Sequence, residues 1–194
     1  TLDIRIDDSV PSTVAVGGGG VLQVDEANIN TAGGASTTIN YASAFSENFG
    51  ADGPGSTAYS LILNNAASGL VDSQSGEEVL LSVENGEIVG RTASGGEEVL
   101  RVTVSDSGEV TLSQLRAVQH GEPGSATDDE ISIASGTISL EQTITDADGD
   151  DASAVLDLGT FLIFQDDAPV APNPAPVQLD IPVSTVTVED VQAS

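Results

Sequence analysis

The sequence predicts an all-β protein folded as an antiparallel β-sandwich, of the immunoglobulin-like or a related type. Short segments in which apolar and polar residues alternate recur about every ten residues, and this period of two is typical of half-buried strands. Glycine and asparagine separate the segments, and Asn85-Gly86 is a strong signal for a two-residue hairpin. Many short strands with turn residues between them are typical of a sandwich.

The first residues predict a strand followed by an acidic linker. Residues 2–6 alternate between apolar and polar side chains, and Asp7 and Asp8 follow directly. We therefore assign residues 1–10 to an incoming strand and linker. The four glycines at residues 17–20 separate two valine-rich segments, and we interpret them as a flexible connection.

The sandwich itself is predicted over residues 11–167. Residues 25–58 carry little pattern, and Asp52-Gly-Pro-Gly55 near their end is expected to break the chain. Beyond this point the strand patterns become regular. They cover residues 59–63, 79–83, 88–89, 99–104, 110–115, 131–133, 138–144 and 154–158.

The composition changes abruptly after residue 167. Prolines alternate with other residues over 168–176, which predicts a semi-rigid, extended linker. Residues 177–194 again have the pattern of a strand and are interpreted as the start of a next repeat or a tail strand. The segment Ile4–Pro11 resembles Leu162–Pro169, and a period of about 160 residues indicates a tandem array of whole domains.

The charge of the chain restricts its partners. The chain has 31 acidic residues but only four arginines and no lysine, which gives a net charge of -27. Such a chain does not offer a surface for nucleic acid or other phosphates, and no apolar run is long enough for membrane insertion. Cations are the expected partners. The absence of cysteine removes disulfide and thiol chemistry, and a chain without cysteine or methionine suits an oxidising exterior.

The most informative stretch is an acidic turn between two strand patterns, in residues 143–158. Asp146, Asp148 and Asp150 stand at alternate positions around a glycine, and Asp151 follows. Carboxylate oxygens at this spacing are ligands that Ca²⁺ takes, so we predict a Ca²⁺ site at the tip of a β-hairpin. An EF-hand is rejected because the flanks have the pattern of strands. A solvated Asp-Gly turn without metal is the alternative.

Two further acidic pairs stand at equivalent edges of the predicted domain. Asp7-Asp8 and Asp166-Asp167 are placed where a Ca²⁺ ion would clamp one module to the next, and exposed turn carboxylates are the alternative. His120 is the only imidazole. With no cysteine and no second histidine, we do not expect a zinc site there, and we interpret His120 as structural or exposed.

The sequence offers no motif for an enzyme. No serine lies in a Gly-x-Ser-x-Gly pattern, and the glycines at residues 17–20 lack the Lys-Ser/Thr of a phosphate-binding loop. A catalytic carboxylate pair could be chosen almost anywhere among 31 acidic residues, so such a pair carries no information. We therefore expect a protein that is not an enzyme.

Several motifs in order resemble the repeat domain, of the extender or split type, of giant type I-secreted RTX adhesins of Gram-negative bacteria. The likeness covers roughly residues 50–169. The motifs are Asp52–Leu61, Gly108–Leu115, His120 with Asp128-Asp129, Thr143–Leu158 and Gln165–Pro169. The resemblance implies a β-rich, Ca²⁺-stiffened module of a secreted, fibrous adhesin on the bacterial cell surface. Its implied partners are neighbouring repeat domains of the same adhesin and an adjacent ligand-binding domain.

The leading hypothesis is therefore a structural or scaffold module of a calcium-dependent RTX adhesin that mediates bacterial attachment and biofilm formation. The alternative is a ligand-binding adhesion module that recognises sugar, peptide or ice. In some adhesins of this kind the domain is interrupted by an inserted binding module, and no stretch of this chain is long enough to be that insert.

Overall fold

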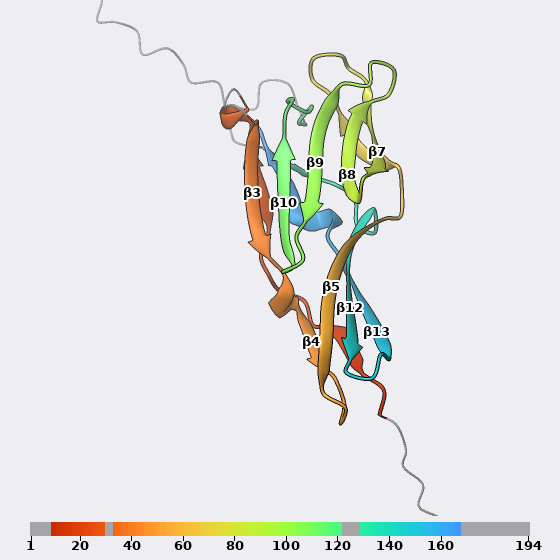
Figure 1. The fold of residues 1–194 in the computed structure, drawn as a ribbon. Helices are drawn as coiled ribbons and strands as arrows, with labels where there is room; N and C mark the ends of the chain where they lie inside the picture. Colours follow the sequence, from red (N-terminus) through yellow and green to blue (C-terminus); the bar gives the residue numbers. More distant parts are fainter. Residues whose placement is uncertain (1–8, 30–32, 122–128, 168–194) are drawn as a thin grey trace, which may run out of the picture.

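The computed structural model describes residues 9–29, 33–121 and 129–167 (Figure 1). The described residues form β-strands joined by turns and by three short 3-10 helices, η1 (Glu26–Asn28), η2 (Ala42–Ala44) and η3 (Gly159–Phe161), and contain no α-helix. The predicted all-β fold with antiparallel sheets packed as a sandwich is confirmed. The predicted incoming strand over residues 2–6, the proline-rich linker and the tail strand lie outside the described residues.

One half of the molecule is built on a curled, antiparallel sheet of six strands. Their order is β3 (Ala35–Asn40), β10 (Glu109–Gln114), β9 (Glu98–Val104), β8 (Glu87–Thr92), β7 (Glu78–Glu84) and β6 (Ala67–Val71). A smaller sheet packs behind it through β2. The smaller sheet comprises β11 (Glu130–Ser132), β14 (Leu162–Gln165) and β2 (Leu22–Asp25). The β14–β2 pair is parallel, so both strands end at the same edge.

The other half consists of two smaller sheets that face each other (Figure 1). The first comprises β13 (Asp151–Asp157), β12 (Ile138–Asp146) and β5 (Pro54–Leu63), and the second comprises β1 (Ser12–Ala15) and β4 (Phe45–Asn48). β1 packs on β12 and β13, while β5 also contacts β7, β8 and β9 of the large sheet. The two halves lie one beyond the other, and the molecule is elongated (Figure 1).

A single hydrophobic cluster runs through both halves. On β12, Ile138, Leu140 and Ile144 are fully buried, and Leu156 and Leu158 are buried after the turn. This is the period-two burial that the sequence predicted for the hairpin. The predicted hairpin at Asn85-Gly86 is also present, and it pairs β7 with β8.

The region from residue 25 to residue 58 is more regular than its sequence suggested. It contains β3, β4 and the first half of β5, which begins at Pro54 inside the predicted break. Proline is tolerated at the first position of a strand because the missing N–H is not needed there. The next position, Gly55, has no room for a side chain, because a Cβ atom there would lie 2.3 Å from the backbone oxygen of Asp146. The predicted break is thus the start of a strand that approaches the acidic turn closely.

The glycines at residues 17–20 are not simply a flexible connection. Tyr41 is fully buried, and its hydroxyl donates a hydrogen bond of 2.9 Å to the carbonyl oxygen of Gly20. Burial also raises the pKa of Tyr41 to about 12. A Cβ atom on Gly19 would lie 2.5 Å from the Tyr41 ring, whereas a Cβ atom on Gly17 would meet nothing. The aromatic ring therefore fixes the second half of this loop.

We expect Gly19→Ala to destabilise the fold by about 1–3 kcal/mol more than Gly17→Ala, because only the former collides with a fully buried ring. Both glycines have positive φ, so both substitutions carry a similar backbone cost. Urea unfolding of the two variants measures the difference. Equal stabilities would mean that the ring does not fix the loop.

A buried ion pair joins the turn after β6 to the segment after β10. The carboxylate of Asp72 is fully buried and accepts two hydrogen bonds of 2.9 Å from the Arg116 guanidinium, from Nε and Nη2. The hydroxyl and the backbone N–H of Ser75 donate to the same carboxylate. The Arg116 guanidinium, followed by Ser75, holds the pKa of Asp72 well below its usual range against the effect of burial.

We expect Arg116→Gln to cost about 3 kcal/mol or more, because it leaves a buried charge without its partner. Arg91→Gln, at the part-exposed pair with Glu84, should cost much less, because solvent screens that pair. Since the folded-state pKa of Asp72 is lowered, its stabilising contribution is complete above the unfolded-state pKa of about 3.9. That contribution is lost as the pH falls further, through the folded-state pKa.

Urea unfolding of the three proteins at neutral pH, and of the wild type across the acid range, tests this expectation. A loss in Arg116→Gln no larger than that in Arg91→Gln would show that the buried pair is not critical.

Candidate metal centres

The tip of the β12–β13 hairpin is closed around one carboxylate. Asp146 is the last residue of β12, and its Oδ1 accepts hydrogen bonds from the N–H groups of Gly149, at 3.1 Å, and Asp150, at 2.9 Å. Its own N–H donates to the carbonyl oxygen of Asp150. The side chain is therefore held in place by the turn that follows it.

Three aspartates meet at this tip. Asp52, Asp146 and Asp148 each offer a carboxylate oxygen, and these oxygens lie within 4.8 Å of one another. Asp146 is only 3% exposed, while Asp52 and Asp148 are exposed. Asp52 reaches the tip because β5 pairs with β12, and the N–H of Ala147 donates to the carbonyl oxygen of Gly53. We refer to these three residues as the tip cluster.

The electrostatics of the tip cluster favour a bound cation. Hydrogen bonding with the Asp148 side chain, and then with backbone N–H groups of residues 148–150, lowers the pKa of Asp146 against the opposing effect of burial. The side chain is therefore ionised at neutral pH. Its second oxygen, Oδ2, is buried and has no hydrogen-bond partner. A buried anionic oxygen beside two further carboxylates is costly unless a positive charge compensates it.

The structure brings together part of the predicted Ca²⁺ ligand set. Asp146 and Asp148 belong to the tip cluster, but the side chains of Asp150 and Asp151 do not. Asp150 contributes its backbone N–H and carbonyl, and Asp151 accepts a hydrogen bond of 2.7 Å from the hydroxyl of Thr145. Asp52 was not predicted as a ligand, because nothing in the local sequence indicates which strand lies beside the hairpin.

The tip cluster is linked to the first residues that the structure describes. The hydroxyl of Ser9 donates a hydrogen bond of 2.9 Å to Oδ2 of Asp52 and accepts one of 2.7 Å from the N–H of Ala51. The chain that leads into β1 is therefore bonded to one of the three aspartates. Asp7 and Asp8 lie outside the described residues, and their role as Ca²⁺ ligands stays a prediction.

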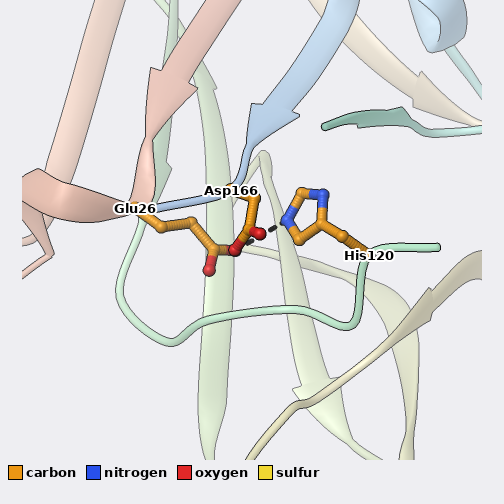
Figure 2. A group of neighbouring side chains, drawn as sticks. All are labelled: Glu26, His120 and Asp166. Atoms are coloured by element: carbon orange, nitrogen blue, oxygen red, sulfur yellow. Dashed lines mark hydrogen bonds and ion pairs between the residues drawn. The ribbon is translucent and has the colours of Figure 1, made fainter. Parts of the chain in front are cut away.

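A second cluster lies where β2 and β14 end (Figure 2). Glu26 is in η1 directly after β2, Asp166 directly follows β14, and His120 lies in the segment after β10. One ligand atom from each of the three lies within 4.8 Å of the others. We refer to these three residues as the exit cluster. Of the predicted pair at this edge, Asp166 belongs to the exit cluster, whereas Asp167 is exposed and lies outside it.

Glu26 is the buried centre of the exit cluster. Its Oε1 accepts hydrogen bonds from Nε2 of Gln114, at 2.7 Å, and from the N–H of Val118, at 2.8 Å. Nε2 of His120 lies 3.2 Å from the same oxygen. The side chains of Glu26 and His120 are 5% and 6% exposed. His120 is thus buried beside two carboxylates, an arrangement that the sequence did not indicate.

The fold and the two clusters define an elongated β-sandwich module with an acidic centre towards each end. Residues 21–159 match the family described as "Domain of unknown function (DUF5801)", and the chain belongs to this family. No curated protein matches the chain, and no solved structure does. In the part of the chain that the structure describes, there is no helix with the length and hydropathy needed to cross a lipid bilayer.

We expect Asp148→Asn to weaken Ca²⁺ binding at least about tenfold, the loss that removing even an outer-shell partner of a metal site can cause. Asp151→Asn is the matched control, since it changes the same charge three residues away outside the tip cluster. Calorimetric titration with Ca²⁺ gives both affinities. Equal weakening in the two variants would indicate that the whole turn attracts cations diffusely.

Proposed function

We propose that this chain is a structural module of a calcium-dependent adhesin, secreted and displayed on the bacterial cell surface, where it mediates attachment and biofilm formation as a spacer between neighbouring repeats. The observation that carries the proposal is the tip cluster. It joins the hairpin tip, the start of β5 and the chain entering β1 through one group of carboxylates. Ca²⁺ bound there would stiffen the end of the module at which the chain enters.

The path of the chain supports a role as a spacer. In Figure 1, β1 lies beside the β12–β13 hairpin at one end of the elongated body, and η1 lies towards the other end. The described chain therefore starts near the tip cluster and leaves β14 beside the exit cluster. A module whose two connections lie at opposite ends extends a linear array, because successive copies are added along its long axis.

The balance of charge supports dependence on divalent cations. The net charge of -27 destabilises a compact chain by self-repulsion unless salt or bound ions offset it. The three arginines in the described residues are already engaged with acidic side chains away from the tip cluster. Ca²⁺ suits the site because it accepts six to eight oxygen ligands in flexible geometry, and water completes the shell around exposed carboxylates.

We expect Ca²⁺ to raise the melting temperature of the module. Ligand that binds only the folded state stabilises it by about 1.4 kcal/mol at tenfold excess over the dissociation constant. Extracellular modules bind Ca²⁺ with dissociation constants of about 10⁻⁴ to 10⁻³ M. Millimolar Ca²⁺ is therefore between about equal to and about tenfold above the dissociation constant. Mg²⁺ at the same concentration should stabilise less, because it demands near-ideal octahedral geometry and gives up its water reluctantly.

Melting curves in Ca²⁺, Mg²⁺ and EDTA at matched ionic strength test the expectation, with the double variant Asp52→Asn/Asp148→Asn as the control. The Ca²⁺-dependent rise should be absent from the double variant. Identical curves for the wild type in Ca²⁺ and EDTA would refute calcium dependence, and clear, competable binding to a glycan array would favour a ligand-binding module instead.

A further inference from the structure

The exit cluster differs in kind from the tip cluster because it includes an imidazole. Three segments far apart in the sequence supply Glu26, His120 and Asp166, and their ligand atoms converge within 4.8 Å. Figure 2 shows the Nε2 side of the His120 ring turned towards both carboxylates. Two of the three side chains are at least nine-tenths buried, at 5% and 6% exposure. The cluster is therefore a largely enclosed group of one nitrogen and several oxygen donors.

A buried carboxylate, that of Glu26, with the part-buried carboxylate of Asp166 beside it, favours a positive charge between the two. The arginines in the described residues do not supply it. Arg91 and Arg101 pair with glutamates on β7, β8 and β9, and Arg116 pairs with Asp72. The described residues therefore offer no arginine to the exit cluster.

Two buried side-chain atoms in and beside the exit cluster make no hydrogen bond in the described part of the chain. Among the described residues, His120 makes no side-chain hydrogen bond outside the cluster, since Nε2 faces Glu26 and the buried Nδ1 has no partner. Gln114 is fully buried and donates to Glu26 through Nε2, while its own Oε1 has no hydrogen-bond partner. A buried histidine is normally satisfied by surrounding groups. In the described part of the chain, its one side-chain partner is the carboxylate of Glu26.

We propose that Glu26, His120 and Asp166 bind a divalent first-row transition-metal ion, for which Zn²⁺ is the probe. Zinc accepts histidine nitrogen at about 2.0–2.1 Å and carboxylate oxygen at about 2.0–2.2 Å, usually as a tetrahedron. Two ligands of such a tetrahedron lie about 3.3 Å apart, and the three ligand atoms of the exit cluster all lie within 4.8 Å of one another. Calcium prefers oxygen ligands alone, so the imidazole selects against it.

This proposal revises the expectation that a single histidine without cysteine makes a zinc site improbable. That expectation considered only histidine and cysteine as ligands. The fold places the carboxylates of Glu26 and Asp166 beside His120. Three protein ligands leave a fourth position for water or for a donor from a neighbouring molecule. The ion would tie the chain leaving β14 to η1 and to the segment after β10. This site goes beyond the proposed function. Its test uses Zn²⁺ and variants of the exit cluster, whereas the proposed function is tested with Ca²⁺ and variants of the tip cluster.

Calorimetric titration with Zn²⁺ tests the site, in a background of Asp52→Asn/Asp148→Asn that removes the tip cluster. One Zn²⁺ ion per chain is expected. His120→Gln and Asp166→Asn should each weaken binding at least about tenfold. Asp167→Asn is the matched control, because it makes the same charge change at the adjacent exposed residue and should leave binding unchanged. Co²⁺ in place of Zn²⁺ should give a visible absorption band that depends on His120.

Melting curves in EDTA show whether each variant folds. If His120→Gln does not fold, the comparison of Zn²⁺ binding by Asp166→Asn and Asp167→Asn still tests the proposal. Both residues lie at the end of the described chain, where a substitution disturbs the core least. The absence of Zn²⁺ binding to the background protein would overturn the proposal. So would equal binding to all variants, which would assign the ion to dispersed surface carboxylates.

Discussion

The pairing of β12 with β5 is the constraint on which the rest of this structure depends. β12 is the central strand of its sheet, with β13 on its other side, and its alternate residues Ile138, Leu140 and Ile144 are fully buried in the shared core. At the end of this pairing the register shifts between Thr145 and Asp146, so that Pro54 lies opposite Asp146 and Asp52 lies beside the hairpin tip. A shift of one residue would turn the apolar face outward and would also separate the aspartates. Burial of the core and assembly of the tip cluster therefore both depend on the β12–β5 pairing, and the tip cluster also depends on the register shift at its end.

Positive charge is scarce in this chain, and the fold uses it away from the two clusters. Arg91 and Arg101 lie among glutamates on the large sheet, and Arg116 compensates the buried Asp72. The tip cluster and the exit cluster contain no arginine, although each has a carboxylate that is nearly or fully enclosed. In our proposals a cation from solvent compensates both places, so the stability of the module should respond to its ionic environment.

The two clusters have different chemistry because different elements form them. The tip cluster is formed by the turn of a hairpin and a neighbouring loop, and two of its three side chains are exposed to water. All three are aspartates, so the cluster offers only oxygen ligands, which Ca²⁺ prefers. The exit cluster lies beside the parallel β14–β2 pair, where two strands end together and a third segment covers them with an imidazole. An extended module with one such centre towards each end is compatible with the proposed role as a spacer.

The sequence by itself determined the all-β class, the β12–β13 hairpin with its acidic tip and the turn at Asn85-Gly86, because these depend on period-two burial and on local turn chemistry. It also indicated Asp146 and Asp148, which belong to one turn. Only the tertiary structure decided that Asp52 completes the tip cluster, that Asp150 and Asp151 do not, and that Glu26 meets His120 and Asp166. Those contacts join residues far apart in the chain, so they depend on which segments the fold places side by side, and no local pattern encodes that.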